Sequence, residues 1–458
     1  MATTSEITLP RTLGLRDLVL AQILYLTIPE FFGTAAKAGA YQFALWSAAI
    51  LLFYVPEALV VSRLNRLFPL EGGLYEWARI AFGDRMGFLV AWNLWLYVVV
   101  YMAMAGLLAT SFVAYAIGPS AGWMGSNKRL TLAASAFLIC ALVFVARLGL
   151  GLGKWITNAG SALTIVTICA LIAMPFVHVW RGTLTGYRPL TLAVPPLSIF
   201  SLSVFSKMTF GALCGFEFVA IFAGECRDPE RNLSRSILIS APIIALLYVL
   251  GTSAILAFVP TDQVDVVAAI PQALTVAFRD FSFAKLILPL CVIALLTNYV
   301  STFNINFSGA ARLPMVAGWD HLLPAWFTRL HPKYRTPVNS ILFAGTIALA
   351  ASMAVMIGVK EQEAFELLLI WAFTFYATAY LALFAIPLLA KQRELESSWK
   401  HRAAAAAGFL VTLLYIVLSV FPIIEVPSPA RYAMKTGAVI ILANVLGVVI
   451  YRIGSQET

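Results

Sequence analysis

Long apolar runs separated by short polar segments are the feature that most constrains the fold of this chain. A helix needs about 20 mostly apolar residues to cross the hydrocarbon core of a bilayer. Twelve runs of this kind follow one another along the 458 residues, separated by charges and by Gly and Pro. The predicted helices span residues 16–37, 42–62, 86–116, 130–147, 155–179, 197–223, 236–259, 284–310, 338–358, 364–390, 404–424 and 433–452.

The composition supports the same conclusion. Hydrophobic residues make up 61% of the chain and charged residues only 12%, whereas about a quarter of an ordinary soluble domain is charged. Soluble enzymes, secreted scaffolds and disordered tails are therefore excluded, and we expect an all-α polytopic membrane protein. The five cysteines form no C-x-x-C pair, so no disulfide framework, metal site or cofactor is expected.

The distribution of positive charge predicts the topology. The N-terminus, the loops after even-numbered helices and the C-terminus together carry 20 Lys and Arg residues, and the other loops carry 10. Cytoplasmic loops hold the excess of Lys and Arg, so both termini are expected in the cytoplasm and the chain in the cell membrane. This bias accounts for most of the net charge of +9, and nucleic acid is not expected as a partner.

The first predicted helix contains a proline near its middle. Pro29 follows Leu26, Thr27 and Ile28 and precedes Glu30, and residues before proline avoid the α-helical region. Thr27 and Glu30 match the T-x-x-E capping box, and proline is tolerated in the first turn of a helix. We therefore expect the helix to stop and to restart at Thr27; a simple proline kink is the alternative.

The sixth predicted helix has the same kind of weak point. Gly211, Cys214 and Gly215 lie in mid-span just before Phe216 and Glu217. Breaks in the first and sixth helices predict an inverted repeat of helices 1–5 and 6–10, with a binding site at the midplane between them. Glycines that serve only helix packing are the alternative. The residues predicted to line the site are Tyr25, Thr27, Ile28, Glu30, Gly211, Leu213, Cys214, Gly215 and Phe216.

Four charged side chains lie inside predicted spans, where each is costly unless paired or hydrated. Glu30 and Glu217 adjoin the two breaks, and Glu57 follows Pro56 in the second helix. Glu57 either pairs with a basic side chain near the cytoplasmic end of its helix or has a functional role. For Lys207 we expect pairing with an acid rather than snorkelling to the surface.

The eighth predicted helix carries a polar stripe. Asn298, Thr302 and Asn306 are spaced four residues apart and so share one helix face. Hydrogen bonds between helices explain such a stripe as well as contact with a ligand does.

Three segments together resemble the amino acid–polyamine–organocation (APC) family of secondary transporters. Residues 68–77, FPLEGGLYEW, are similar to that family's F-P-x-x-G-G-x-Y-x-W segment. Residues 215–217, GFE, and 223–232, AGECRDPERN, resemble its G-F-E and A-G-E-x-x-x-P-x-R-N signature. Residues 312–324 resemble the R-x-x-x-x-x-A-x-D-x-L-x-P segment that follows the eighth helix.

The resemblance implies a LeuT-like fold that works by alternating access. Five plus five inverted helices would form the core, in residues 16–180 and 197–390, and two further helices would follow in residues 404–452. The cytoplasmic ends would be residues 1–15 and 453–458. The segments 37–39, KAG, and 56–59, PEAL, look closest to the branch of plant polyamine and related cation uptake carriers.

Two departures from the family pattern bear on the substrate. Most members have a Gly-rich break in the first helix whose N–H groups hold a carboxylate, but here Pro29 offers no N–H and Glu30 brings a negative charge. The usual grip on an α-amino acid is therefore in doubt. Gly211 stands where relatives often carry an aromatic gate, which predicts a roomier pocket or a gate supplied from elsewhere.

The coupling ion is expected to be a proton. Glu30, Glu57 and Glu217 are carboxyls in a low-dielectric setting, which favours the protonated form of an acid, and they are the predicted coupling groups. The alternative is sodium, which relatives of this fold bind through a hydroxyl pair in the eighth helix; Ser301 and Thr302 match that pair.

These features predict a permease that imports an amino acid, a polyamine or a related organic amine by symport, with exchange as an alternative mode. A membrane enzyme is disfavoured because the chain has no HExxH, GxSxG or P-loop motif. A solute sensor would need an output domain for which no loop is long enough. A disulfide-linked heavy chain is not expected, since the loop 118–129 has no cysteine.

Overall fold

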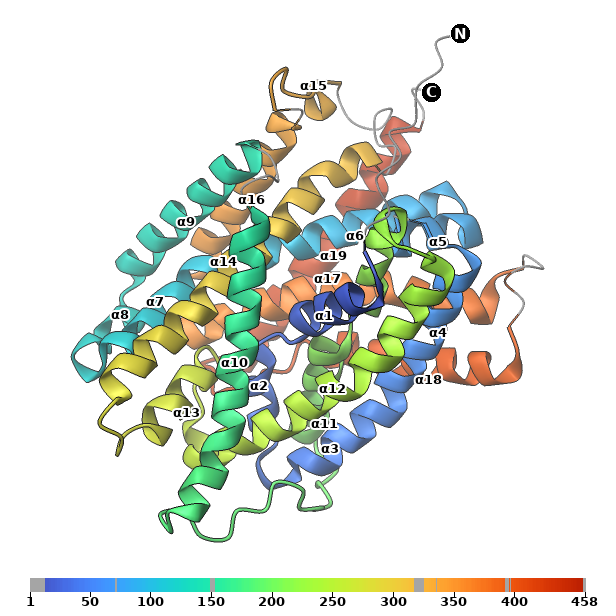
Figure 1. The fold of residues 1–458 in the computed structure, drawn as a ribbon. Coiled ribbons are helices and arrows are strands. Elements are labelled where there is room, and N and C mark those ends of the chain that lie inside the picture. The colour runs from blue at the N-terminus through green and yellow to red at the C-terminus, as the bar shows by residue number, and fades with distance from the viewer. Residues whose placement is uncertain are drawn as a thin grey trace.

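The structure is a computed structural model that describes residues 13–70, 72–148, 153–316, 325–334, 336–391, 395 and 397–455. Helices form almost all of this part of the chain (Figure 1). Its β-type pairing is limited to one isolated bridge between Leu13 and Cys226. The predicted all-α class is confirmed. Of the expected cytoplasmic ends, residues 1–12 and 456–458 lie outside the described residues, as do residues 317–324 of the third family-like segment.

The helices follow one another with short connections. In the first part of the chain they are α1 (Leu15–Leu26), α2 (Glu30–Ala36), η1 (Gly39–Tyr41), α3 (Gln42–Ala49), η2 (Ile50–Tyr54), α4 (Val55–Leu67), α5 (Leu74–Phe82), α6 (Asp84–Met102), α7 (Ala105–Ile117), η3 (Pro119–Ala121), α8 (Trp123–Ser126), α9 (Lys128–Leu148) and α10 (Gly153–Trp180). In the second part they are α11 (Ile199–Leu213), η5 (Phe216–Glu225), α12 (Pro229–Phe258), η6 (Thr261–Gln263), α13 (Ala269–Ala277), α14 (Ala284–Val316), α15 (Ala325–Thr328), α16 (Val338–Val355), α17 (Glu361–Leu389), α18 (Trp399–Leu418) and α19 (Pro429–Gly454).

Among the described residues, 11 helical segments are long and apolar enough to cross a membrane. They coincide with the second to twelfth predicted spans. The first predicted span is not among them because it is divided into α1, with 12 residues, and α2, with 7. Neither piece alone reaches the length of about 20 residues that a bilayer requires, so the predicted number of twelve single spans is not confirmed.

Two predicted spans are less regular than the apolar pattern indicates. In 42–62, one π-helical turn, η2, separates α3 from α4. Pro56 follows directly; proline lacks an N–H and crowds the carbonyl four residues earlier, which explains the wider turn. In 86–116, the helix is interrupted at Ala103 and Met104, between α6 and α7. Both irregular turns adjoin residues of the candidate site described below.

The broken segments lie in the interior of the bundle. Figure 1 shows α1, α2, α11 and α12 grouped in the middle, and the contacts between elements agree, since α2 packs against α11 and α12 and α1 packs against α12 and η5. Helix α17 packs against α6 and α18 and is buried along most of its length. These interior elements carry the side chains that form the candidate site.

Candidate functional site

The first break separates α1 from α2 at residues 27–29. The Thr27 N–H donates to the Ile23 carbonyl at 3.2 Å, and the Thr27 hydroxyl donates to the same carbonyl at 2.7 Å. Both bonds complete the last turn of α1. Pro29 then precedes α2 with a backbone φ of −59°, the value that proline fixes and that a helix start requires. The break predicted around Pro29 is confirmed.

The predicted capping box is wrong. Helix α2 begins at Glu30 rather than at Thr27, and its N-cap residue, Pro29, makes no side-chain cap. The Thr27 hydroxyl is instead bonded backward to Ile23, a local bond that competes with capping of the following helix. The Glu30 carboxyl therefore does not serve as the second half of a capping box.

The second break separates α11 from η5 at Cys214 and Gly215. Gly215 has a φ of +126°, a backbone conformation that glycine adopts without steric cost. The continuation from Phe216 to Glu225 is a 3₁₀-helix rather than an α-helix. The predicted interruption at these residues is confirmed.

A carboxylate from another helix occupies the free N–H groups of the second break. Oε1 of Glu57, in α4, accepts hydrogen bonds from the N–H groups of Gly215 and Phe216, each at 3.0 Å. The Tyr380 hydroxyl of α17 also donates to this oxygen, at 2.9 Å. Pairing of Glu57 with a basic side chain, one of the two expectations, is therefore wrong: the carboxyl caps the half-helix that begins at the break, where the helix dipole favours negative charge.

The N–H group of the first break is also occupied by the chain itself. The Ile28 N–H donates to the Tyr248 hydroxyl oxygen at 2.8 Å, and that hydroxyl donates to the Leu26 carbonyl at 2.9 Å. Tyr248 lies in α12 and is fully buried. A single tyrosine thus satisfies a donor and an acceptor on the two sides of the break.

Glu30 projects from the first turn of α2 into a buried aromatic environment. The Tyr101 hydroxyl donates to Oε1 of Glu30 at 2.6 Å. The other oxygen, Oε2, is buried and has no hydrogen-bond partner, although Glu30 is only 2% exposed. A buried polar atom without a partner costs free energy, so this oxygen is a natural place for a ligand that donates a hydrogen bond.

Glu217 occupies the equivalent place after the second break. Its two carboxyl oxygens accept hydrogen bonds from the hydroxyls of Tyr376 and Tyr380, which lie one turn apart on α17. Glu217 is 6% exposed. The two break-associated carboxyls, Glu30 and Glu217, are therefore each held by tyrosine hydroxyls.

Three stacked tyrosine rings connect these two carboxyls. The Tyr97 ring lies between the ring of Tyr101, with centroids 5.8 Å apart, and the ring of Tyr376, with centroids 4.5 Å apart. Tyr101 bonds Glu30 and Tyr376 bonds Glu217. The tyrosines were missed by sequence reasoning. The signal for them was the spacing of four residues, in Tyr97 and Tyr101 and again in Tyr376 and Tyr380, which places each pair on one helix face.

Tyr25 and the polar stripe of α14 meet beside the second break. The Tyr25 ring stacks on Phe218, with centroids 3.6 Å apart, and its hydroxyl donates to the Asn306 side chain at 3.0 Å. Asn298 is also buried. The stripe therefore makes an interhelical hydrogen bond at Asn306, one of the two roles expected for it.

The hydroxyl pair of α14 is less clearly part of the site. The Ser301 hydroxyl donates to the Thr297 carbonyl of its own helix at 2.8 Å, and the side chain of Thr302 is half-buried. Neither residue has a recorded bond to a residue of the two breaks.

The remaining predicted site residues are packed by aromatic rings. Phe31 of α2 lies against Gly211, so closely that a Cβ atom at this position would overlap the Phe31 ring. The space beside Gly211 is thus filled from the other broken helix. Phe216 stacks on Tyr54, with centroids 4.8 Å apart, and Leu213 and Cys214 are buried.

Lys207 pairs with an acid, as predicted. Its ammonium group donates to Oε1 of Glu366 at 2.8 Å and to the Phe421 carbonyl at 2.6 Å. The Ile423 N–H donates to the same Glu366 oxygen at 3.0 Å. The ion pair therefore joins α11 to α17 and to the connection between α18 and α19.

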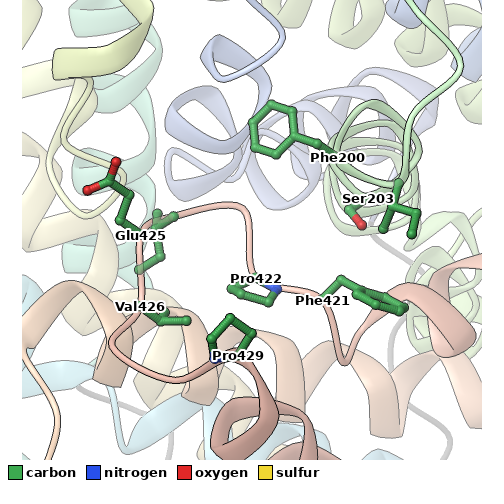
Figure 2. A pocket seen from close by; sticks show the side chains of 9 residues that line it. Phe200, Ser203, Phe421, Pro422, Glu425, Val426 and Pro429 are labelled. Carbon is green, nitrogen blue, oxygen red and sulfur yellow. The ribbon is translucent and has the colours of Figure 1, made fainter.

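The candidate site is closed in this structure. Glu57 is fully buried, and the side chains around both breaks are shielded from solvent. A cavity of about 530 Å³ lies elsewhere, between α11 and the α18–α19 connection. Figure 2 shows Phe200 and Ser203 on one side of this cavity and Pro422, Val426 and Pro429 on the other, with the Glu425 carboxylate directed away from it. A substrate can reach the breaks only after surrounding elements move.

Comparison with known proteins agrees with this architecture. The sequence profile of the family described as "Amino acid permease" matches residues 18–451. An uncharacterized transporter of Legionella pneumophila is 29% identical over 340 residues, which are 74% of this chain and 72% of that protein. The low-affinity putrescine importer PlaP of Escherichia coli is 27% identical over 76% of each chain.

A third relative is similar to the same extent of the chain. The probable agmatine/putrescine antiporter AguD of Lactococcus lactis is 24% identical over 72% of this chain and 69% of its own length. The family profile covers nearly the whole sequence, and the described residues form the helical bundle with broken helices that a LeuT-like fold requires. The chain is therefore a multi-pass membrane protein that belongs to the amino acid permease family within the APC group of transporters.

Proposed function

We propose that this permease carries a small organic amine, with putrescine-like diamines as the preferred class, by proton-coupled symport. The observation that carries the proposal is that the chain's own side chains occupy the N–H groups at both breaks, whereas two carboxyls remain beside them. Oε1 of Glu57 holds the Gly215 and Phe216 N–H groups, and Tyr248 holds the Ile28 N–H. An α-amino acid would have to displace these groups to bind its carboxylate.

The carboxyls favour a cationic ligand. Oε2 of Glu30 is buried and has no hydrogen-bond partner among the described residues, and an ammonium group supplies three donors and a compensating charge. The rings of Tyr101 and Tyr97 lie beside it, and aromatic faces attract cations.

Two carboxyls favour a ligand with two ammonium groups. Glu30 and Glu217 lie at the two ends of the stack formed by Tyr101, Tyr97 and Tyr376. A diamine can place one ammonium at each carboxyl. The names of two relatives, a putrescine importer and a probable agmatine/putrescine antiporter, support this assignment.

Protons are the proposed coupling ions because buried carboxyls adjoin the breaks while the Ser301 hydroxyl is bonded within its own helix. Alternating access supplies the mechanism: rearrangement around the two breaks exposes the site to one side of the membrane at a time. The excess of Lys and Arg on one set of loops supports cytoplasmic termini.

A thermal-shift screen of the purified protein tests the substrate class, since a ligand that binds the folded state raises stability by mass action. We expect putrescine to raise the melting temperature. Butylamine, which has the same carbon chain and one ammonium group fewer, should raise it much less, and leucine should have no effect. Stabilisation by leucine without stabilisation by putrescine would refute the amine assignment.

A further inference from the structure

The inference concerns how the buried acids of the second break share protons, and it rests on the proposed proton coupling. Glu57 of α4 and Glu217 of η5 are linked by one hydroxyl. The Tyr380 side chain of α17 contacts Oε1 of Glu57 and Oε2 of Glu217, and its oxygen also accepts the Gly215 N–H at 2.6 Å. Tyr376 bonds the other oxygen of Glu217.

A count of protons shows that the two hydroxyls are not enough for these contacts. Three oxygen–oxygen contacts join the four side chains, namely Tyr376 to Glu217, Tyr380 to Glu217 and Tyr380 to Glu57. Each tyrosine hydroxyl has one proton to donate. All three contacts are hydrogen bonds only if one of the two carboxyls carries a further proton.

The geometry also indicates which carboxyl carries it. Oε1 of Glu57 accepts from the Gly215 and Phe216 N–H groups and from Tyr380, so this oxygen acts only as an acceptor. The further proton therefore lies on Oε2 of Glu217. It is donated to the Tyr380 oxygen, and the Tyr380 proton is in turn donated to the ionised Glu57.

The surroundings offer no cation to both acids. The ion pairs recorded among the described residues are Glu76 with Arg79 and Glu366 with Lys207, and neither includes Glu57 or Glu217. Two adjacent carboxylates without a cation repel each other, and a shared proton relieves that repulsion. The other titratable side chains that face the pair are neutral at pH 7 and come from η2, α1, α6, α17 and the break: Tyr54, Tyr25, Tyr97, Tyr376 and Cys214.

We propose that Glu57, Tyr380 and Glu217 hold a single proton that moves between the two carboxyls through the Tyr380 hydroxyl. In the transfer, Glu217 gives its proton to the Tyr380 oxygen and the original Tyr380 proton passes to Oε1 of Glu57. The tyrosine ends neutral, as it began, and the negative charge moves from Glu57 to Glu217.

The transfer connects substrate binding to the break itself. An ammonium group that binds at Glu217 favours the ionised form of that carboxyl and so drives the proton to Glu57. A neutral carboxyl accepts hydrogen bonds more weakly than a carboxylate. The hold of Glu57 on the Gly215 and Phe216 N–H groups therefore weakens when substrate arrives, which frees η5 to move relative to α11.

Infrared spectroscopy of the ligand-free protein at neutral pH tests the shared proton directly. We expect a carbonyl band of a protonated carboxyl that shifts in heavy water and disappears in Glu217→Gln. If the wild-type protein has no such band, or if the band is unchanged in both Glu217→Gln and Glu57→Gln, the shared proton is refuted. Because no substrate is present, this result stands even if putrescine is not the substrate.

Uptake by Tyr380→Phe and Tyr376→Phe tests the transfer step. Both variants remove one hydroxyl from Glu217, but only the first removes the link to Glu57. In proteoliposomes with an inward proton gradient, we expect Tyr380→Phe to lower the concentrative uptake of putrescine by about a hundredfold, the lower end of what positioned proton-transfer groups contribute. Exchange of internal for external putrescine should persist. Equal losses in the two variants, or equal loss of uptake and exchange in Tyr380→Phe, would refute transfer through Tyr380.

Discussion

The Tyr101 hydroxyl donates a hydrogen bond of 2.6 Å to Oε1 of Glu30, while Oε2 of the same carboxyl has no partner. One oxygen is therefore fixed by α6, and the other remains available inside the bundle. This arrangement positions a carboxylate for a ligand without using the N–H groups of the break.

Replacement of Glu30 by Gln should weaken amine binding while preserving the fold. Glutamine keeps an oxygen that accepts the Tyr101 bond but loses the charge that attracts an ammonium group. A charged hydrogen bond contributes about 1.5–3 kcal/mol, so the affinity for putrescine should fall about ten- to a hundredfold. Titration of the purified variant by thermal shift measures this change.

Glu425→Gln is the matched control for that measurement because Glu425 is exposed in the α18–α19 connection. It should bind putrescine as the wild type does. Wild-type affinity and concentrative uptake in Glu30→Gln would instead reduce Glu30 to a structural role.

Gly211→Ala should destabilise the protein through a clash with Phe31. The added methyl group would overlap the Phe31 ring, and overpacking of this kind costs about 1–3 kcal/mol. The melting temperature and the transport rate should both fall, and Gly211→Trp should do more damage than Gly211→Ala. Adding Phe31→Leu to Gly211→Ala should recover part of the lost stability.

Gly437→Ala in α19 provides the comparison, since a Cβ atom there meets open space and alanine is the better helix former. It should not lower the melting temperature. A Gly211→Ala variant as stable and active as the wild type would show that α2 and α11 do not pack as described.

The buried pair of Lys207 and Glu366 should show strong energetic coupling. Lys207→Met leaves Glu366 as an unpaired buried charge, and breaking such a pair costs about 3–5 kcal/mol. The double variant with Glu366→Leu should be more stable than Lys207→Met alone. A double-mutant cycle on the free energy of unfolding measures the coupling.

The exposed pair of Arg79 and Glu76 is the control for the cycle. The Arg79 side chain is 47% exposed, and exposed pairs contribute at most about 1 kcal/mol. Coupling energies of equal size for the two pairs would contradict the burial of Lys207.

Uptake should not depend on sodium. The Ser301 hydroxyl donates to the Thr297 carbonyl, so Ser301→Ala with Thr302→Ala should leave putrescine uptake unchanged when choline replaces sodium. Uptake that requires sodium in the wild type and is lost in this variant would assign the hydroxyl pair to a sodium site.

The positions of the two breaks were predictable because their causes are local. Pro29 cannot continue α1, and Gly215 adopts a backbone conformation that disfavours other residues. The capping box failed for a local reason as well, since the Thr27 hydroxyl found its acceptor in the preceding turn at Ile23. Short motifs of this kind do not reveal which of two nearby turns a side chain will serve.

The partners of the buried charges were not predictable from spacing. Glu57 and Tyr380 are 323 positions apart in the chain, and their contact depends on the packing of α4 against α17. An acidic partner for Lys207 was expected from the cost of a buried charge, but the identity of Glu366 depends on the same long-range packing. The tyrosines around Glu30 and Glu217 likewise become a site only when α6 and α17 come together.

Uptake of labelled putrescine into proteoliposomes tests the central claim most directly, when an inward proton gradient is the only driving force and a dye reports internal pH. The vesicles contain no ATP, sodium or internal substrate. The account predicts concentrative uptake accompanied by acidification of the interior, abolished by a protonophore and unaffected by excess leucine. Uptake that needs internal putrescine or external sodium, or that leucine inhibits, would contradict it.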